Sequence, residues 1–318
     1  MNLCTLLTVF LLALQDNTAD PPAGTPATAA SEAENSKSTA AQTWSLRYQF
    51  HPGQQLRYQS QQQMTLEAQV GENHRLDVSQ VRQVRRYGVS ETNGDLTKLS
   101  MQFEDVWMQR QVDQEPAVEF RSSMKPNEVP EVFKNVAHSL RGAAPVFRMN
   151  TLGRSVTGAA GAGAGESANA PAVPASAPAR DASADPGSFL MLLPESATAI
   201  GGTWKEEFQV QVRGGENLQL PVQILRTYRL ESVEDGIARV TFRSSVQTPL
   251  RGTVIRSQLI QATPSGSFLL DISRGQMVRR EFRWNETVIG ALGPESILSS
   301  HGTQTDELLR ADAEPAAN

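Results

Sequence analysis

Apolar and polar side chains alternate between residues 201 and 285, in short stretches that turn-forming residues separate. Along residues 204–213, the even-numbered positions are mostly apolar, whereas the odd-numbered positions carry Lys, Glu, Gln or Arg. A period of two is typical of a β-strand with one buried face. Short turns favour an antiparallel meander over parallel units, which need crossover helices. We expect six strands here, at residues 204–213, 222–233, 238–246, 253–262, 268–272 and 278–284.

A similar alternation precedes this region, within residues 43–157. Asn93-Gly94 predicts a hairpin, because these residue types tolerate the positive φ angles of a two-residue turn. The sequence therefore predicts two β-rich portions, residues 43–157 and 188–302, and leaves open whether they share one sheet. In the first portion we expect four strands, which begin near residues 44, 56, 75 and 96, and a further short strand at 147–149.

One segment, residues 127–142, has helical periodicity. Apolar residues recur there at intervals of three and four, as on the buried stripe of an amphipathic helix. Pro130 suits the first turn and Gly142 suits a C-terminal cap. We expect this helix to cover one face of the sheet. Its apolar residues are Val129, Val132, Phe133, Val136, Ala137 and Leu140.

The remaining segments offer little to a folded core. An apolar run at the N-terminus is shorter than the ~20 residues that a membrane-spanning helix needs. We interpret it as the centre of a signal peptide, with a buried N-terminal helix as the alternative. The spacer, the linker and the C-terminal tail, which are of low complexity or high polarity, are expected to be disordered. Residues 294–300 are expected to form a short helical turn. The segments are a signal peptide at 1–19, a spacer at 20–42, a linker or insertion at 158–187, and a tail at 303–318.

Composition and charge narrow the functional classes. The formal net charge is −5 and the arginines are scattered, whereas a nucleic-acid surface needs a basic face. Cys4 is the only cysteine and lies inside the predicted signal peptide, so the mature chain is expected to hold no disulfide and no thiolate metal site. We therefore expect no nucleic-acid partner and no membrane contact beyond the signal peptide.

No motif in the sequence predicts catalysis. The four histidines, His51, His74, His138 and His301, lie far apart, and no pair has metal-ligand spacing. The chain lacks the GxSxG turn of serine hydrolases, and the glycines of residues 158–187 lack the Lys-Ser/Thr of a phosphate-binding loop. We therefore assign no catalytic, cofactor-binding or metal-binding residue, and expect no cofactor.

Two groups of arginines stand out within predicted strands. We interpret them as solubilising charges that also discourage pairing between sheet edges. The alternative is a patch that binds an anionic head group or an acidic polysaccharide. The groups are Arg82, Arg85 and Arg86 in the first portion and Arg279, Arg280 and Arg283 in the second.

Three local signatures, taken in order, resemble a family of exported bacterial proteins that is known only as a domain of unknown function. The resemblance covers residues 44–284, interrupted by the low-complexity insert, and it implies export and a β-rich fold without an established activity. The signatures are residues 46–50 (LRYQF) with Pro52-Gly53 and 56–58 (LRY); Leu193-Pro194 with 202–204 (GTW); and 228–230 (YRL) with the glycine turn at 271–275.

We expect a mainly β protein: an antiparallel meander, with a curved half-barrel as one possible form, covered by one amphipathic helix. The leading hypothesis is an exported protein, located in the periplasm, at the cell surface or outside the cell, that has no enzymatic activity. It binds a hydrophobic or amphiphilic ligand, such as a lipid, or another component of the envelope. One alternative is a structural or adhesive surface module. The other is a hydrolase whose site is assembled from distant residues. The oligomeric state stays open.

Overall fold

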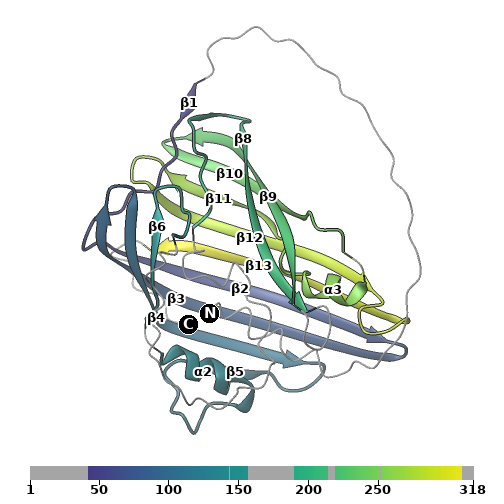
Figure 1. The fold of residues 1–318 in the computed structure, drawn as a ribbon. Coiled ribbons are helices and arrows are strands. Elements are labelled where there is room, and N and C mark those ends of the chain that lie inside the picture. Colours follow the sequence, from purple (N-terminus) through teal and green to yellow (C-terminus); the bar gives the residue numbers. More distant parts are fainter. Residues whose placement is uncertain (1–41, 143, 157–189, 214–218, 251, 310–318) are drawn as a thin grey trace, which may run out of the picture.

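The computed structural model describes residues 42–142, 144–156, 190–213, 219–250 and 252–309. One antiparallel sheet of eleven strands dominates this part of the chain (Figure 1). The two β-rich portions belong to this single sheet. They join where β2 (Gln55–Val70), from the first portion, pairs with the whole length of β13 (Ser296–Leu309), from the second.

Neighbouring strands of the sheet are mostly consecutive in the sequence, as the meander prediction requires. The spatial order is β5-β4-β3-β2-β13-β12-β11-β10-β9-β8, with β6 paired to β4 beside this path. In the described chain β5 and β8 do not pair, so the sheet is open. The other strands of the sheet are β3 (Asn73–Asn93), β4 (Leu96–Val112), β5 (Val118–Arg121), β6 (Val146–Asn150), β8 (Thr203–Arg213), β9 (Gln219–Glu234), β10 (Ile237–Val246), β11 (Ser265–Asp271) and β12 (Gln276–Ile289). The short strands β1 (Thr43–Trp44) and β7 (Thr198–Ala199) form a separate pair.

Turn chemistry sets the hairpins that the sequence predicted. Gly71 and Gly94 both have φ +57°, at the β2–β3 and β3–β4 turns, where most residues with a Cβ atom would be strained and Asn or Asp least. Register shifts interrupt the pairing of β3 with β4, of β9 with β10 and of β11 with β12. Such irregularities bend and twist the strands that carry them.

The largest core lies on one face of the sheet, called the inner face below, and is rich in tyrosine. Tyr58, Tyr87 and Tyr228 are all buried there. Residues 190–193 are part of this core. They are fixed by Tyr48, whose hydroxyl donates to the Met191 carbonyl at 2.8 Å and accepts from the Met191 N–H at 3.1 Å.

The predicted helix at 127–142 is present but shorter. A single 3-10 turn, η2 (Glu131–Phe133), leads into α2 (Lys134–Leu140), because the extended backbone of Pro130 (ψ 146°) delays the helix start. The predicted stripe is buried: Val129, Phe133, Val136 and Ala137 pack on Val81, Val106, Met108 and Phe120 of β3, β4 and β5. The helix thus covers only the end of the inner face beside β5 (Figure 1).

Three predictions for the second portion are wrong. Residues 253–258 form a helix, α3 (Thr253–Gln258), and not a strand. Residues 294–300 are not a helical turn, and residues 303–309 are not a disordered tail: both contribute to β13. Strand structure prevails there because β13 is paired on both sides, with β12 and with β2, so its main-chain groups are satisfied in spite of its polar sequence.

The predicted signal peptide at 1–19, the spacer at 20–42 except for its last residue, and the linker at 158–187 lie outside the described residues. Within the described ranges, neither helix has the length and apolar character needed to cross a membrane.

Candidate functional site

The sheet divides at one end because β11 is shorter than its neighbours. β11 pairs with β10 only as far as Arg243 and with β12 only as far as Arg283. Beyond these points β10 continues to Val246 and β12 continues to Ile289, with no described strand between them. The division is therefore a direct result of strand lengths.

Residues 253–262 occupy the space between the two diverging strands. Leu259 and Ala262 pack with Val210 and Ile224 on the β8–β9 side. Ile260 packs instead with Val288, on the β12–β13 side. This segment therefore joins the two sides of the divided sheet through apolar contacts.

Hydrogen bonds hold α3 at both of its ends. The Thr253 hydroxyl donates to the Gly290 carbonyl, just beyond β12, at 2.6 Å. The Gln258 side chain makes two bonds with the main chain of Arg213 in β8: its oxygen accepts from the N–H at 2.8 Å and its nitrogen donates to the carbonyl at 2.9 Å. The helix is thus bonded to β8 on one side and to the residue that follows β12 on the other.

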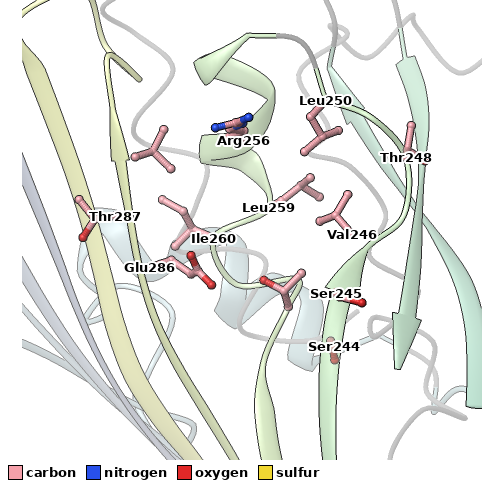
Figure 2. Close-up of a pocket in the computed structure, with 12 residues that line it drawn as sticks. Ser244, Ser245, Val246, Thr248, Leu250, Arg256, Leu259, Ile260, Glu286 and Thr287 are labelled. Carbon is pink, nitrogen blue, oxygen red and sulfur yellow. The ribbon is translucent and has the colours of Figure 1, made fainter. Parts of the chain in front are cut away.

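A cleft of ≈ 470 Å³ lies between the end of β10, α3 and β12 (Figure 2). Aliphatic, hydroxyl and charged side chains all line it. The aliphatic residues are Val246, Leu250, Leu259, Ile260 and Val288; the hydroxyl residues are Ser244, Ser245, Thr248, Thr263 and Thr287; and the charged residues are Arg256 and Glu286. The lining is therefore mixed, with aliphatic residues interspersed among a larger number of hydroxyl and charged residues.

The two strands that border the cleft also offer main-chain groups. After Arg283, β12 pairs with β13 alone, and after Arg243, β10 pairs with β9 alone. A strand without a neighbour on one side presents its N–H and C=O groups along that side. A ligand in the cleft therefore meets hydrogen-bonding groups from both backbones as well as from the serine and threonine hydroxyls.

Away from the cleft, a buried ion cluster lies at the centre of the inner face. Asp306 of β13 accepts hydrogen bonds from Arg280 of β12, at 2.7 and 3.0 Å, and from Arg85 of β3, at 2.7 Å. Burial alone would raise the pKa of Asp306, but the charges of Arg280 and Arg85 and the hydrogen bonds of Arg280 and Ser60 lower it to about 2. The cluster connects strands on either side of the β2–β13 junction, which indicates a structural role.

The members of the two arginine groups that the sequence analysis named lie on different faces of the sheet. Arg85 and Arg280 are buried in β3 and β12, which are not edge strands, so the prediction of solubilising edge charges is wrong for these two. The others lie on the opposite, outer face. There Arg82 lies over the Trp107 ring, Arg279 pairs with Glu281 and Glu307, and Arg283 pairs with Glu281.

The histidines do not form a site. His51, His138 and His301 are exposed on different elements, and His74 pairs with Glu67 at 2.7 Å. Among the described residues, no group of three His, Cys, Asp or Glu side chains is placed to hold a metal ion. Of the described residues that line the cleft, Glu286 is the one carboxylate, and none is a histidine.

Sequence reasoning missed the cleft because residues 253–262 were assigned to a strand. Their β-branched composition favours that assignment. A helical signal was nevertheless present: Ile255, Leu259 and Ala262 follow one another at intervals of four and three residues, and all three contact the same apolar cluster.

No family model matches the chain, and no curated protein matches it either. A solved structure titled for lipid–protein interactions in lipovitellin aligns with 85% of this chain, at 11% identity and a TM-score of 0.43. The aligned part is 26% of that chain. The open-gate secretin InvG of the Salmonella SPI-1 type III secretion injectisome aligns with 82% of this chain and 63% of its own, at 7% identity and a TM-score of 0.15. Values this low support no inference about the function of this chain.

Proposed function

We propose that this protein is an exported, non-enzymatic binding protein of the cell envelope that holds a hydrophobic or amphiphilic ligand in the cleft between β10, α3 and β12. The observation that carries the proposal is the lining of this cleft, in which aliphatic side chains from β10, from β12 and from the residues on either side of α3 face a space of ≈ 470 Å³. Ligand pockets in proteins commonly have volumes of about 300–1,000 Å³. The cleft is therefore large enough for an alkyl chain or a similar apolar body.

The distribution of polar groups favours an amphiphile over a purely apolar ligand. Ser245 and Thr287 lie on the outer faces of β10 and β12, whereas the inner faces carry Val246 and Val288 together with the polar Ser244 and Glu286. An apolar body in contact with the inner-face residues gains from leaving water, and a polar end keeps its hydrogen bonds at the hydroxyls. Both ends of an amphiphile thus find suitable partners in one cleft.

A blocking variant tests the proposal. Thr287→Trp puts a large ring at an exposed cleft position, on a strand that tolerates aromatic residues. Asn285→Trp is the matched control, since Asn285 lies on the same strand and the same outer face but does not line the cleft. Binding of an uncharged fluorescent fatty amide is followed by anisotropy, and circular dichroism checks that both variants fold.

We expect saturable binding to the wild type, a Kd at least tenfold higher for Thr287→Trp, and an unchanged Kd for Asn285→Trp. If the wild type shows no saturable binding, or if both variants weaken binding equally, the proposal is wrong.

A specific observation also favours the adhesive alternative. Gln109, Gln80, Gln63 and Thr303 lie in direct cross-strand register on the outer face, across β4, β3, β2 and β13. Amide and hydroxyl groups in a row suit the hydroxyls of a polysaccharide. Sedimentation with insoluble envelope polysaccharide tests this function: retention that Gln63→Leu weakens supports it, and no retention of the wild type excludes it.

A further inference from the structure

Two opposite charges face the cleft from different walls. Arg256 lies on α3 and Glu286 on β12, and both line the cleft (Figure 2). Within the described chain, neither side chain makes an ion pair or a hydrogen bond, and the two do not pair with each other. The cleft thus holds a separated cation and anion, each open to a ligand.

Two other charged side chains near the cleft are paired. Arg283, three residues before Glu286 on β12, contacts Glu281 at 3.4 Å. Arg226 on β9, opposite Ser244 of the cleft, contacts Glu206 at 3.3 Å. Arg243, next to Ser244 on β10, makes no ion pair within the described chain, so unpaired charges also occur outside the lining. Arg256 and Glu286 are distinguished by lining the same cleft.

We infer that the polar end of the ligand is a zwitterion, whose anionic group contacts Arg256 and whose ammonium group contacts Glu286. This inference rests on the proposed function. A guanidinium matches the oxygens of a phosphate or carboxylate, and a carboxylate accepts hydrogen bonds from an ammonium. The aliphatic body of the same ligand lies against Ile260 and Val288.

The same arrangement selects against amphiphiles with a single charge. An alkyl phosphate satisfies Arg256 but meets the carboxylate of Glu286, and an alkylammonium satisfies Glu286 but meets the cation of Arg256. Like charges that face each other weaken binding. The expected order is therefore zwitterionic ligand first, neutral ligand second, and singly charged ligands last.

Calorimetric titrations with ligands of equal alkyl length, below their micelle concentrations, test this order. The probes are a lyso-phosphatidylethanolamine, a long-chain α-amino acid, an alkyl maltoside, an alkyl phosphate and an alkylammonium. We expect one of the two zwitterions to bind at least fivefold more tightly than the maltoside. Tighter binding of the first identifies a phospholipid head group, and tighter binding of the second identifies an amino-acid zwitterion.

Charge reversal gives the sharper test. Arg256→Glu and Glu286→Arg are each expected to weaken binding of the better zwitterion at least fivefold. The double variant restores binding, because the zwitterion then binds in the opposite sense. The controls are Arg239→Glu, on the outer face of β10, and Glu234→Arg, at the end of β9, which reverse exposed charges that do not line the cleft. Thermal unfolding confirms that each variant folds.

The outcomes separate this inference from the proposed function. Absence of binding for every probe, including the neutral maltoside, rejects the proposed function itself. Equal binding of all probes, unchanged by charge reversal, rejects the zwitterion and leaves the cleft as an apolar site. Failure of a folded double variant to recover the binding that the single variants lose also overturns the two-point contact.

Discussion

Arg280 donates two hydrogen bonds, from Nε and Nη2, to the same carboxylate oxygen of Asp306, at 3.0 and 2.7 Å. The other oxygen accepts from Arg85 at 2.7 Å. All three residues are buried, and they lie on β12, β13 and β3. Since β2 and β13 are where the two β-rich portions meet, this cluster connects them at the centre of the inner face.

Asp306→Asn is expected to lower the free energy of unfolding by about 3 to 5 kcal/mol, because removing one partner of a buried ion cluster leaves the other charges uncompensated. Denaturant unfolding followed by circular dichroism measures the loss. The matched control is Glu307→Gln: its carboxylate pairs with Arg279 on the exposed face, where such pairs contribute little, roughly 0 to 1 kcal/mol. Equal effects of the two substitutions would show that the cluster does not stabilise the fold.

The same carboxylate predicts acid sensitivity. The pKa of Asp306 is lowered from 3.8 to about 2, so its contribution to stability is complete above pH 3.8 and is lost as the pH falls through about 2. The expected loss is about 2 kcal/mol. The pKa of Asp271 is also lowered, mainly by the Ser273 hydroxyl, but Asp271 titrates alike in the wild type and in Asp306→Asn and cancels in their difference. The free energy of unfolding, measured with denaturant at several pH values in this range, should fall more steeply for the wild type than for Asp306→Asn. Parallel curves for the two proteins would contradict the assignment of the acid sensitivity to Asp306.

All four tyrosines are buried, and burial raises the pKa of each. The folded protein therefore favours the neutral phenol of each tyrosine. The resulting contribution to the free energy of unfolding is complete below pH 10.0 and is lost as the pH rises above that value. In an alkaline titration followed by ultraviolet absorbance, we expect tyrosinate to form only together with loss of the β-sheet circular dichroism signal. Gradual ionisation near pH 10.0 in a protein with native circular dichroism would show that the rings are accessible.

Gly302 makes room for the Trp284 ring at the centre of the sheet. A Cβ atom at Gly302 would lie 2.3 Å from the ring and 2.5 Å from the Gln63 carbonyl oxygen. Gly302→Ala is therefore expected to lower the free energy of unfolding by about 1 to 3 kcal/mol, the usual range for an overpacked site. Gly94→Asn is the control, since that turn has open space and Asn tolerates its positive φ. Thermal unfolding compares the two, and equal stability of Gly302→Ala and the wild type would contradict the close packing.

The elements that local patterns determine were predictable from the sequence. The alternation along β8, the Asn93-Gly94 hairpin and the apolar stripe of α2 each depend on residues close together in the chain, and each is present. The fold class followed from the same signals. The joining of both portions into one sheet did not, because it depends on β13, whose alternate residues are mostly polar.

The candidate site was not predictable, because its helix depends on tertiary contacts. A six-residue helix rich in Thr, Val and Ile has low intrinsic stability, so α3 depends on the packing of the adjoining Leu259 and Ile260 and on the hydrogen bonds of Thr253 and Gln258. Asp306 was missed for a related reason. A lone acid in a polar segment indicates burial only once its partners, 26 and 221 residues away in the sequence, are known.

Photo-crosslinking tests the cleft as the ligand site most directly. An uncharged amphiphile with a diazirine in its alkyl chain is bound, irradiated and mapped by mass spectrometry of the resulting peptides. The account predicts adducts within residues 244–263 and 286–288, which contain the cleft lining, and their loss when an unlabelled amphiphile competes. Adducts confined to other parts of the inner face, or spread evenly over the sheet, would contradict it.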